Sequence, residues 1–328
     1  MTETAGVDAT SVNDKEAREE RIRLHHEATE KKLAIFKQIT YAVINAIPHE
    51  YAATKAVFGE AETIPSAFRK QTIRYVTLND AAGNDMYVAL AGTSGAGTAQ
   101  AAAATAQVHV TCPHVTKVIL IGIAAGQPNM VDKEKDVRLG DIVVGDKLIQ
   151  YDHIKRTDGI AELRGDNIMP ADRQLMQAVD RLRSHQARKG SWTVDKPWDS
   201  YIKRGCGEIE NAARPERSQD PKSETRKYEK GHTYTRSDDH PYVHVGTIGS
   251  ANILLKDAVF RDSLNKNHGI VAFEMEGAGV AIASATFSLG YLNVRGICDY
   301  GDNEKNDDWQ RYASVCAASF ARAVLEEG

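Results

Sequence analysis

Residues 117–125, KVILIGIAA, form an apolar run that is uninterrupted after its first residue. A strand that alternates polar and apolar residues has one face in water, whereas an uninterrupted run is typical of a strand covered on both faces. Strands of that kind occur mainly in parallel sheets that have helices on both sides. This stretch therefore predicts a central strand in a layered α/β domain.

The sequence on either side of this run alternates between strand and helix patterns. Strand patterns are present at 39–47, 73–80, 85–92, 140–152, 243–250, 269–274 and 293–299. One helix pattern begins at Glu50. Further helix patterns occupy about 98–108, 170–188, 255–267, 277–289 and 309–327. This alternation favours an α/β fold with a mostly parallel sheet. In such sheets ligands bind beyond the carboxyl ends of the strands, so polar residues at those ends are candidates for a site.

Composition limits the class of protein. The chain of 328 residues is 42% hydrophobic and 26% charged, which is typical of soluble globular proteins and excludes a disordered or collagen-like chain. Its formal net charge of −4 excludes a globally basic nucleic-acid binder. No apolar run approaches the ~20 residues that a membrane-spanning helix requires.

The cysteines give an expectation about location. Cys112, Cys206, Cys298 and Cys316 are widely spaced and form no CxxC or Cys/His pattern, and the first residues show no secretory signal. We therefore expect reduced thiols in a cytoplasmic protein.

Positive charge is concentrated in one region. Residues 181–236 carry fourteen Lys or Arg against eight Asp or Glu, so the remainder of the chain is strongly acidic. The periodicity of the sequence is weak over 160–240, and 205–240 is predicted to be a long loop. This basic insertion is either a solvated charged loop or a surface that meets a phosphate group.

Residues 13–38 are rich in Glu, Lys, Arg and Ala and contain no Gly or Pro, which predicts one long helix. Its few apolar residues indicate either a solvated surface helix or an element of assembly. We expect a division into an extension at 1–38 and one domain at 39–328 that contains the basic insertion at about 160–240.

Three acidic positions follow predicted strands. Glu274 and Glu276 flank Met275 where one strand ends and a helix begins, and residues i and i+2 of an extended chain point the same way. Carboxylates beside an apolar run are costly to desolvate, so packing does not explain them well, and they can accept hydrogen bonds from sugar hydroxyls. The structural alternative is stabilisation of the helix N-terminus by negative charge.

Asp299 directly follows the strand pattern NVRGIC, and Glu50 follows the one that ends at 47. Asp299 could protonate a leaving group if its partly apolar surroundings raised its pKa, or it could merely cap a turn. Glu50 could anchor or activate a water molecule, or act as a carboxylate of a first helical turn.

A small-residue loop, GTSGAG at 92–97, lies between a strand and an Ala-rich helix. Its backbone N–H groups could bind an anion, although close packing of the backbone explains the glycines equally well. The loop lacks the Gly-Lys-Ser/Thr of a Walker A motif, and no zinc-ligand spacing is present. We expect no metal and no organic cofactor.

In this order the segments resemble the nucleoside phosphorylase and nucleosidase superfamily, which includes purine and uridine phosphorylases, methylthioadenosine/S-adenosylhomocysteine nucleosidase and AMP nucleosidase. The strongest segments are AFEMEGAGVA (272–281) and VRGICDYGDNEKNDDWQRYASVCAASFARAVL (294–325), supported by AIPHEYAA (46–53) and GDIVVGDKLIQYD (140–152). The resemblance covers about 39–155 and 242–327. It implies a three-layer α/β/α fold around a mixed, mostly parallel sheet.

The resemblance also implies roles for the acidic residues. Glu276 matches the carboxylate that holds the ribose hydroxyls, Met275 the residue that packs on the sugar, and Glu274 a carboxylate near the site. Asp299 matches the acid that serves the purine N7. Glu50 matches the glutamate that positions the attacking water in hydrolytic members.

Further positions are implied less directly. Phosphorolytic members bind phosphate near the glycine loop, here Thr93, Ser94 and Gly95. Ser250 and Asn252 match an element beside the base, although the Gly that usually stands between them is Ala here.

The combined hypothesis is a nucleosidase that hydrolyses the N-glycosidic bond of a purine nucleoside or nucleotide and releases adenine from AMP or ATP. Similar chains occur in fungal multidomain receptors and bacterial antiviral effectors, which would fit a role in antiviral defence. The alternatives are a phosphorolytic purine nucleoside phosphorylase, a non-catalytic nucleotide-sensing module and a nucleic-acid binder that uses the basic insertion. We expect a small-molecule substrate, no membrane or nucleic-acid partner, and a homo-oligomer (dimer, trimer or hexamer), as is usual in the family.

Overall fold

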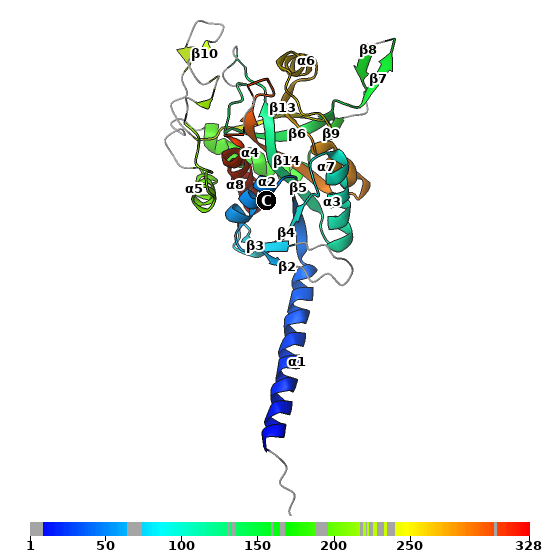
Figure 1. Cartoon of the computed structure of the whole chain (residues 1–328), viewed down its shortest axis with the longest axis vertical. Coiled ribbons are helices and arrows are strands. Elements are labelled where there is room, and N and C mark those ends of the chain that lie inside the picture. Colours follow the sequence, from blue (N-terminus) through cyan, green and yellow to red (C-terminus); the bar gives the residue numbers. More distant parts are fainter. Residues whose placement is uncertain are drawn as a thin grey trace, which may run out of the picture.

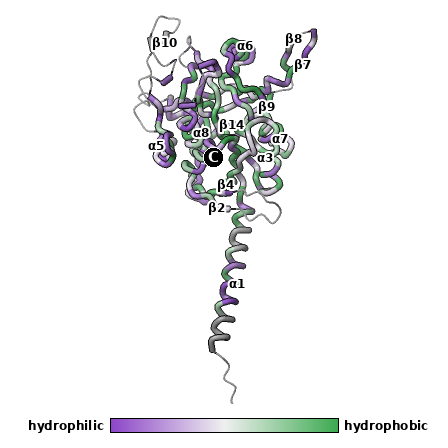
Figure 2. The backbone as a smooth tube through the Cα atoms, viewed as in Figure 1, coloured by the Kyte–Doolittle hydropathy of each residue, from purple (hydrophilic) through white to green (hydrophobic). Residues whose placement is uncertain are grey.

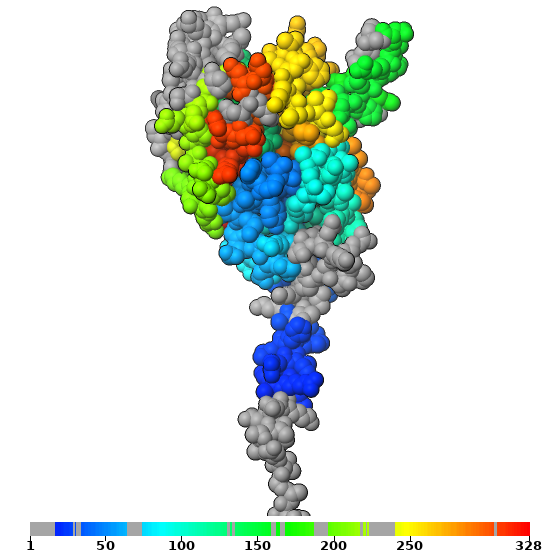
Figure 3. Space-filling model, in the orientation of Figure 1, coloured from blue at the N-terminus to red at the C-terminus, as the bar shows by residue number. Residues whose placement is uncertain are grey.

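The computed structural model describes residues 9–63, 74–129, 132, 135–158, 160–164, 168–187, 196–216, 219–220, 222, 226–227, 233–234, 240–304 and 307–328. They form an α/β domain from which one long helix projects (Figures 1 and 3). The helices are α1 (Ala9–Phe36), α2 (Pro48–Phe58), α3 (Thr98–Thr111), α4 (Arg173–Ala187), α5 (Asp199–Glu208), α6 (Ala258–His268), α7 (Gly277–Thr286) and α8 (Gln310–Glu327). The strands are β1 (Ile39–Asn45), β2 (Glu62–Thr63), β3 (Arg74–Asn79), β4 (Asp85–Gly92), β5 (Lys117–Gly126), β6 (Ile142–Gln150), β7 (Ile154–Thr157), β8 (Ile160–Leu163), β9 (Ile168–Pro170), β10 (Arg226–Lys227), β11 (Thr233–Tyr234), β12 (Val243–Ser250), β13 (Ile270–Glu274) and β14 (Gly290–Asp299).

The apolar run at 117–125 becomes β5, the centre of a mixed sheet. Among the described strands the order is β13-β12-β6-β14-β5-β1-β4-β3-β2, and β9 pairs with β6. Strand β5 runs parallel to both β1 and β14. The pairs β6–β12, β12–β13 and β1–β4 are also parallel, whereas β14–β6 and β3–β4 are antiparallel.

The sheet closes partly on itself. Strand β13 pairs with β12 and, through Ala272 and Phe273, also with the end of β5. Strands β5, β14, β6, β12 and β13 therefore form a closed circuit. As a result the carboxyl ends of β5, β13 and β14 meet at one place, although more than a hundred residues separate β5 from β13 in the sequence.

Helices cover both faces of the sheet (Figure 1). Helix α8 packs on β14 and β5 and contacts α2, α4 and α5, whereas α7 packs with α3 against the opposite face. The central strands are largely hydrophobic in Figure 2, as expected for strands buried on both sides. The predicted three-layer α/β/α fold with a mixed sheet is confirmed.

The structure departs from the sequence prediction in the basic insertion. Helix α5 occupies the beginning of the segment that we predicted to be a loop from 205, and it packs on α8. Strands β7 and β8 form a hairpin that the sequence analysis did not include. Much of 188–239, including Trp192, lies outside the described residues.

Helix α1 begins at Ala9 and ends at Phe36, close to the predicted range. In its last turn Ile35 and Phe36 pack against the core of the domain, while Ile22 and Leu24 are exposed. No helix in the described part of the chain is both long and apolar enough to span a membrane.

Strand β14 and helix α8 approach so closely that one position must be glycine. A Cβ atom on Gly296 would lie 1.9 Å from the carbonyl oxygen of Ala313 in α8. Because that oxygen belongs to a helix backbone, it can move only if the helix moves. We predict that Gly296→Ala lowers the free energy of unfolding by about 3 kcal/mol or more, as severe overpacking does.

Urea unfolding of the purified protein measures this loss. The matched control is Gly207→Ala in α5, where an added Cβ meets no atom within 4 Å. This control should be neutral or stabilise the protein by about 0.5–1 kcal/mol, because alanine favours a helix. Equal stability of the two variants would contradict the packing account.

Candidate active site

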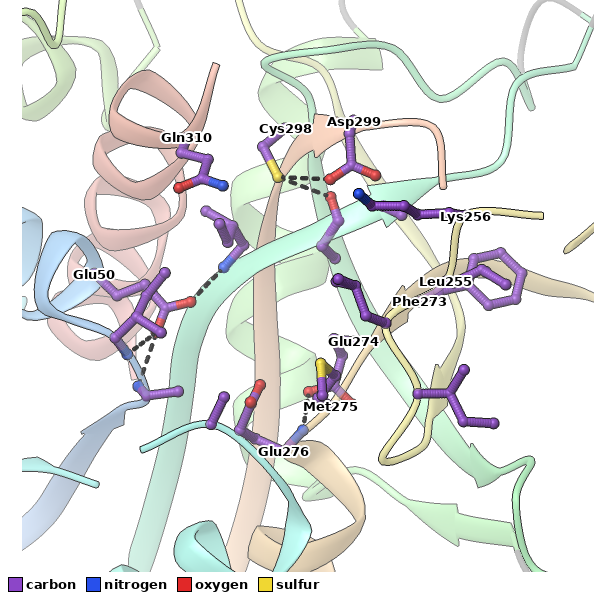
Figure 4. A pocket seen from close by; sticks show the side chains of 18 of the residues that line it. Glu50, Leu255, Lys256, Phe273, Glu274, Met275, Glu276, Cys298, Asp299 and Gln310 are labelled. Atoms are coloured by element: carbon purple, nitrogen blue, oxygen red, sulfur yellow. Dashed lines mark hydrogen bonds between the residues drawn. The ribbon is translucent and has the colours of Figure 1, made fainter. Parts of the chain in front are cut away.

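A cavity of about 510 Å³ opens where the carboxyl ends of β5, β13 and β14 meet. Figure 4 shows Glu50, Glu276 and Asp299 around this space, each on a different part of the chain. Glu274 and Met275 also line it. The five residues that the sequence analysis placed at strand ends therefore lie on one cavity. The close approach of β13 to β5 explains this, since it brings the Glu274–Glu276 segment beside the ends of the central strands.

A fully buried arginine, Arg295 of β14, holds the carboxylates together. Its guanidinium bonds to Glu274 and lies 3.5 Å from Glu276 Oε2 and 3.8 Å from Glu50 Oε1. Asn293 accepts a further hydrogen bond from Arg295 Nε at 2.8 Å. Planar guanidinium groups suit such multiple contacts with carboxylates. Arg295 is thus the shared counter-charge of three buried acids.

The sequence analysis did not select Arg295. An arginine within the apolar pattern NVRGIC was a signal, because a charge inside a buried strand needs partners. Strand β5 leaves room for it: a Cβ atom on Gly122 would lie 2.3 Å from Arg295 Nη1 and 2.4 Å from Glu50 Oε1. Glycine at this position therefore permits the Arg295–Glu50 contact.

Glu50 is fixed at the start of α2. Its Oε2 accepts hydrogen bonds from the N–H groups of Ala46 at 2.8 Å and Ile47 at 3.1 Å, and its Oε1 accepts one from the N–H of Ile123 at 2.9 Å. These bonds tie α2 to β5. Glu50 thus belongs to a first helical turn, as the structural alternative supposed, and also lines the cavity.

The surroundings of Glu50 change its protonation. The pKa of Glu50 is raised from 4.5 to about 7: burial is the largest cause, Arg295 opposes it, and the nearby Glu276 adds to the rise. Burial likewise raises the pKa of Glu274, against the opposing effect of Arg295. Glu50 therefore exchanges a proton near neutral pH, as a general base must.

Glu274 and Glu276 make different contacts. Glu274 accepts hydrogen bonds from the N–H groups of Glu276 at 3.1 Å and Gly277 at 2.8 Å, so it stabilises the N-terminus of α7. The structural alternative thus describes Glu274 well. Glu276 Oε1 instead accepts the N–H of Gly97 at 3.0 Å, across the site at the start of α3. Glu276 and Met275 are the members of the segment best placed to meet a substrate.

Asp299 lies at the end of β14. Its Oδ1 accepts the N–H of Gly301 at 2.8 Å, and its Oδ2 lies 3.2 Å from Cys298 Sγ. Lys256 lies beside it in Figure 4. Strand β5 runs between β1 and β14, so Asp299 and Glu50 lie on opposite sides of its carboxyl end.

The basic insertion reaches the loop that follows Asp299. Tyr300 Oη lies 3.1 Å from each carboxylate oxygen of Asp220, and Lys222 Nζ lies 2.9 Å from Asp302 Oδ2. These contacts connect the insertion to residues one and three positions after Asp299. The insertion therefore helps to position the predicted acid.

The side chain of Thr93 stabilises the glycine loop. Thr93 Oγ1 lies 3.0 Å from the carbonyl oxygen of Ala46 and 2.6 Å from that of Gly95, and Ser94 is exposed. None of the three residues predicted to bind an anion lines the cavity, although the adjacent Ala96 does.

Ser250 and Asn252, for which the resemblance implies a position beside the base, contact the starts of two helices. Ser250 is buried and its Oγ accepts the N–H of Ala278, whereas Asn252 Oδ1 accepts the N–H of Thr98, each at 3.0 Å. They stabilise the N-termini of α7 and α3 and do not line the cavity. Their predicted contact with a base stays a prediction.

The cavity also has an apolar wall that the sequence analysis missed. Tyr151 and Phe273 pack edge to face with ring centroids 6.1 Å apart. The Tyr151 hydroxyl is buried and has no hydrogen-bond partner among the described residues. The connection after β12 adds Ile253, Leu254 and Leu255. No periodic pattern marks this connection, so the sequence alone gave no reason to select it.

A match to a protein-family model covers nearly the whole domain. Residues 40–326 match the family model described as "Phosphorylase superfamily". The chain belongs to this superfamily. The resemblance stated from the sequence is thereby confirmed.

The chain is also similar to two curated relatives and one solved structure. A nucleotide-binding leucine-rich repeat (NLR)-like protein of Hyaloscypha variabilis is 28% identical over 86% of this chain and 28% of its own length. The ATP nucleosidase Cap17 of Escherichia coli is 26% identical over 87% of this chain and 51% of its own length. This chain therefore spans about half or less of these relatives. The 5′-methylthioadenosine/S-adenosylhomocysteine nucleosidase of Helicobacter pylori shares the fold, with a TM-score of 0.60 at 15% identity over 88% of this chain and 99% of its own.

We predict that Arg295→Met destabilises the protein by about 3–5 kcal/mol, because it leaves three buried carboxylates without their counter-charge. The loss should grow with pH. In the variant the carboxylate pKa values lie further above those of the unfolded chain, so stability is kept at low pH and lost as the pH rises. Urea unfolding at pH 5 and pH 8 measures the difference.

The exposed Arg181, which pairs with Glu327 at the surface, provides the matched control Arg181→Met. This change should alter stability by less than about 1 kcal/mol at both pH values. If the Arg295→Met deficit were no larger at pH 8 than at pH 5, Arg295 would not be the counter-charge of the acids.

Proposed function

We propose that this chain hydrolyses the N-glycosidic bond of a purine nucleoside or nucleotide. The observation that carries the proposal is the placement of Glu50, Glu276 and Asp299 around one cavity, with Arg295 behind the first two. Glycosidic cleavage needs carboxylates near the sugar and a proton for the departing group. In this cavity Glu276 would serve the sugar and Asp299 the departing group, and Glu50 and Asp299 lie on opposite sides of the end of β5.

Each residue has a part in this mechanism. Glu276 would hold the ribose hydroxyls, with Met275 against the sugar, and would stabilise the positive charge that develops there. Asp299 would share a proton with the departing purine at N7. Glu50 would orient a water molecule and accept its proton as the oxygen attacks C1′. The Tyr151–Phe273 wall would pack against the base.

Hydrolysis is favoured over phosphorolysis by the hydrogen bonds at the start of α3. The N–H of Gly97 is bonded to Glu276 and that of Thr98 to Asn252, so the groups nearest the glycine loop already have acceptors. Glu276 would also repel a phosphate at this position. A phosphorylase would have to break these two hydrogen bonds and move the Glu276 carboxylate before a phosphate could bind here.

We infer adenine nucleotides as substrates, and the similarity to the Escherichia coli relative, an ATP nucleosidase, supports this choice. The alternative that is not an enzyme is a nucleotide-sensing module, which would bind the nucleotide without cleaving it. The presence of all three acids at the cavity favours an enzyme over a sensor, because binding alone does not require a general acid and a base.

The assay is incubation of the pure protein with ATP, AMP, adenosine and methylthioadenosine, with and without inorganic phosphate. We expect chromatography to show free adenine without any need for phosphate. Asp299→Asn should lower kcat about 10²–10⁴-fold, because the amide cannot donate the acid's proton. The exposed Asp180 gives the control Asp180→Asn, which should keep full activity.

Two results would contradict the proposal. Base release that requires phosphate and yields ribose 1-phosphate would make the protein a phosphorylase. Binding of a nucleotide without any base release, in the parent protein as in Asp299→Asn, would make it a sensor.

The raised pKa of Glu50 predicts a pH dependence. Its ionised form is the base, and burial raises the pKa to about 7, so kcat/KM should rise with pH and level off above about 7. Glu50→Gln should lower kcat and abolish this inflection, while the exposed Glu60→Gln retains it. A pH–rate profile that keeps its inflection near 7 in Glu50→Gln would assign the ionisation to another group.

A further inference from the structure

A second hollow of about 620 Å³, here called the side cleft, adjoins the cavity. Asp307 and Gln310 line both spaces, so the two share a wall at the start of α8. His49, which directly precedes Glu50, lines the side cleft as well. The side cleft thus lies next to the predicted water-positioning residue, and Gln310 lies on the Glu50 side of the cavity in Figure 4.

The side cleft carries positive groups that are held in place. The Arg214 guanidinium lies over the ring of the buried Trp309, 5.3 Å from its centroid. Arg311 Nη1 donates a hydrogen bond to the carbonyl oxygen of Glu210 at 2.7 Å. Figure 3 shows the chain near the start of α8 (orange-red) between the insertion (yellow-green) and α2 (blue). The side cleft is therefore built in part by the basic insertion.

Two helix N-termini add to the groups of the side cleft that can attract an anion. Helices α2 and α8 both begin at the side cleft, and helix N-termini attract anions. His49 adds a ring that can donate a hydrogen bond. Together with the arginines, these features suit phosphate oxygens.

Three carboxylates on the same lining restrict the type of anion. Glu216, Asp307 and Asp308 line the side cleft together with the arginines. They would repel a bare polyphosphate. Magnesium, however, is usually bound through one or two carboxylates together with substrate phosphates. The mixed charge therefore favours a phosphate chain that carries its own Mg²⁺.

We propose that the side cleft binds the phosphate chain of a Mg²⁺-bound nucleoside triphosphate whose ribose and base occupy the cavity. This inference rests on the proposed function, which places the base near Asp299 and the water near Glu50. The 5′ carbon then faces the shared wall at Gln310, and the phosphates pass into the side cleft. The basic insertion would thereby select a triphosphate over an unphosphorylated nucleoside.

The test compares ATP with adenosine, both with excess Mg²⁺, in the variants Arg214→Gln and Arg311→Gln. Each change should lower kcat/KM for ATP about tenfold or more, because a charge-assisted hydrogen bond is lost. The value for adenosine should stay within about twofold, since adenosine has no phosphate to lose contact with. Arg204→Gln, at an exposed ion pair within the same insertion, should leave both values unchanged.

Equal losses for ATP and adenosine, or no loss for either, would overturn the inference while base release by the parent protein still supports the proposed function. If no substrate released its base, the proposed function would fail instead. Calorimetric titration of the protein with MgATP would then test whether the side cleft binds the phosphate chain. Binding about tenfold weaker in Arg214→Gln than in the parent protein would support the side cleft, and equal binding would overturn it.

Discussion

The site depends on one buried guanidinium shared by three buried carboxylates. Arg295 contacts Glu50, Glu274 and Glu276, yet one positive charge cannot balance three negative ones. Burial, the largest cause, and the neighbouring Glu276 together raise the pKa of Glu50 to about 7, against the opposing effect of Arg295. In their ionised forms, the carboxylates gathered at this cavity would stabilise a sugar that becomes positive during cleavage. The arrangement of three buried carboxylates around one arginine is thus suited to the proposed reaction.

Much of the fold followed from the sequence, because an uninterrupted apolar strand and alternating helices leave few topologies. The acids were found because the carboxyl ends of neighbouring strands share one edge. Arg295 was missed since its partners follow β1 and β13, and only the closed circuit of strands brings them together. The contacts of Ser250 and Asn252 with two helix starts could not be predicted for a related reason: which group takes a polar side chain depends on the helices packed against it.

The uneven charge of the chain gains a structural meaning. The insertion is basic while the rest of the domain is acidic, and the two meet where Lys222 pairs with Asp302, three residues after Asp299. Arg214 of the same insertion lies beside the start of α8. The insertion therefore touches both the loop that carries the predicted acid and the side cleft, rather than forming a separate charged lobe.

The most direct test of the account is the source of the oxygen that replaces the base. Adenine release from ATP in H₂¹⁸O, with immediate borohydride reduction to stop exchange of the anomeric oxygen with water, is followed by mass spectrometry of the sugar product, which records the nucleophile that attacks C1′. The account predicts one ¹⁸O atom at C1 of the released ribose triphosphate, with or without phosphate in the buffer. A sugar product that carries phosphate at C1 and no ¹⁸O from water would contradict it.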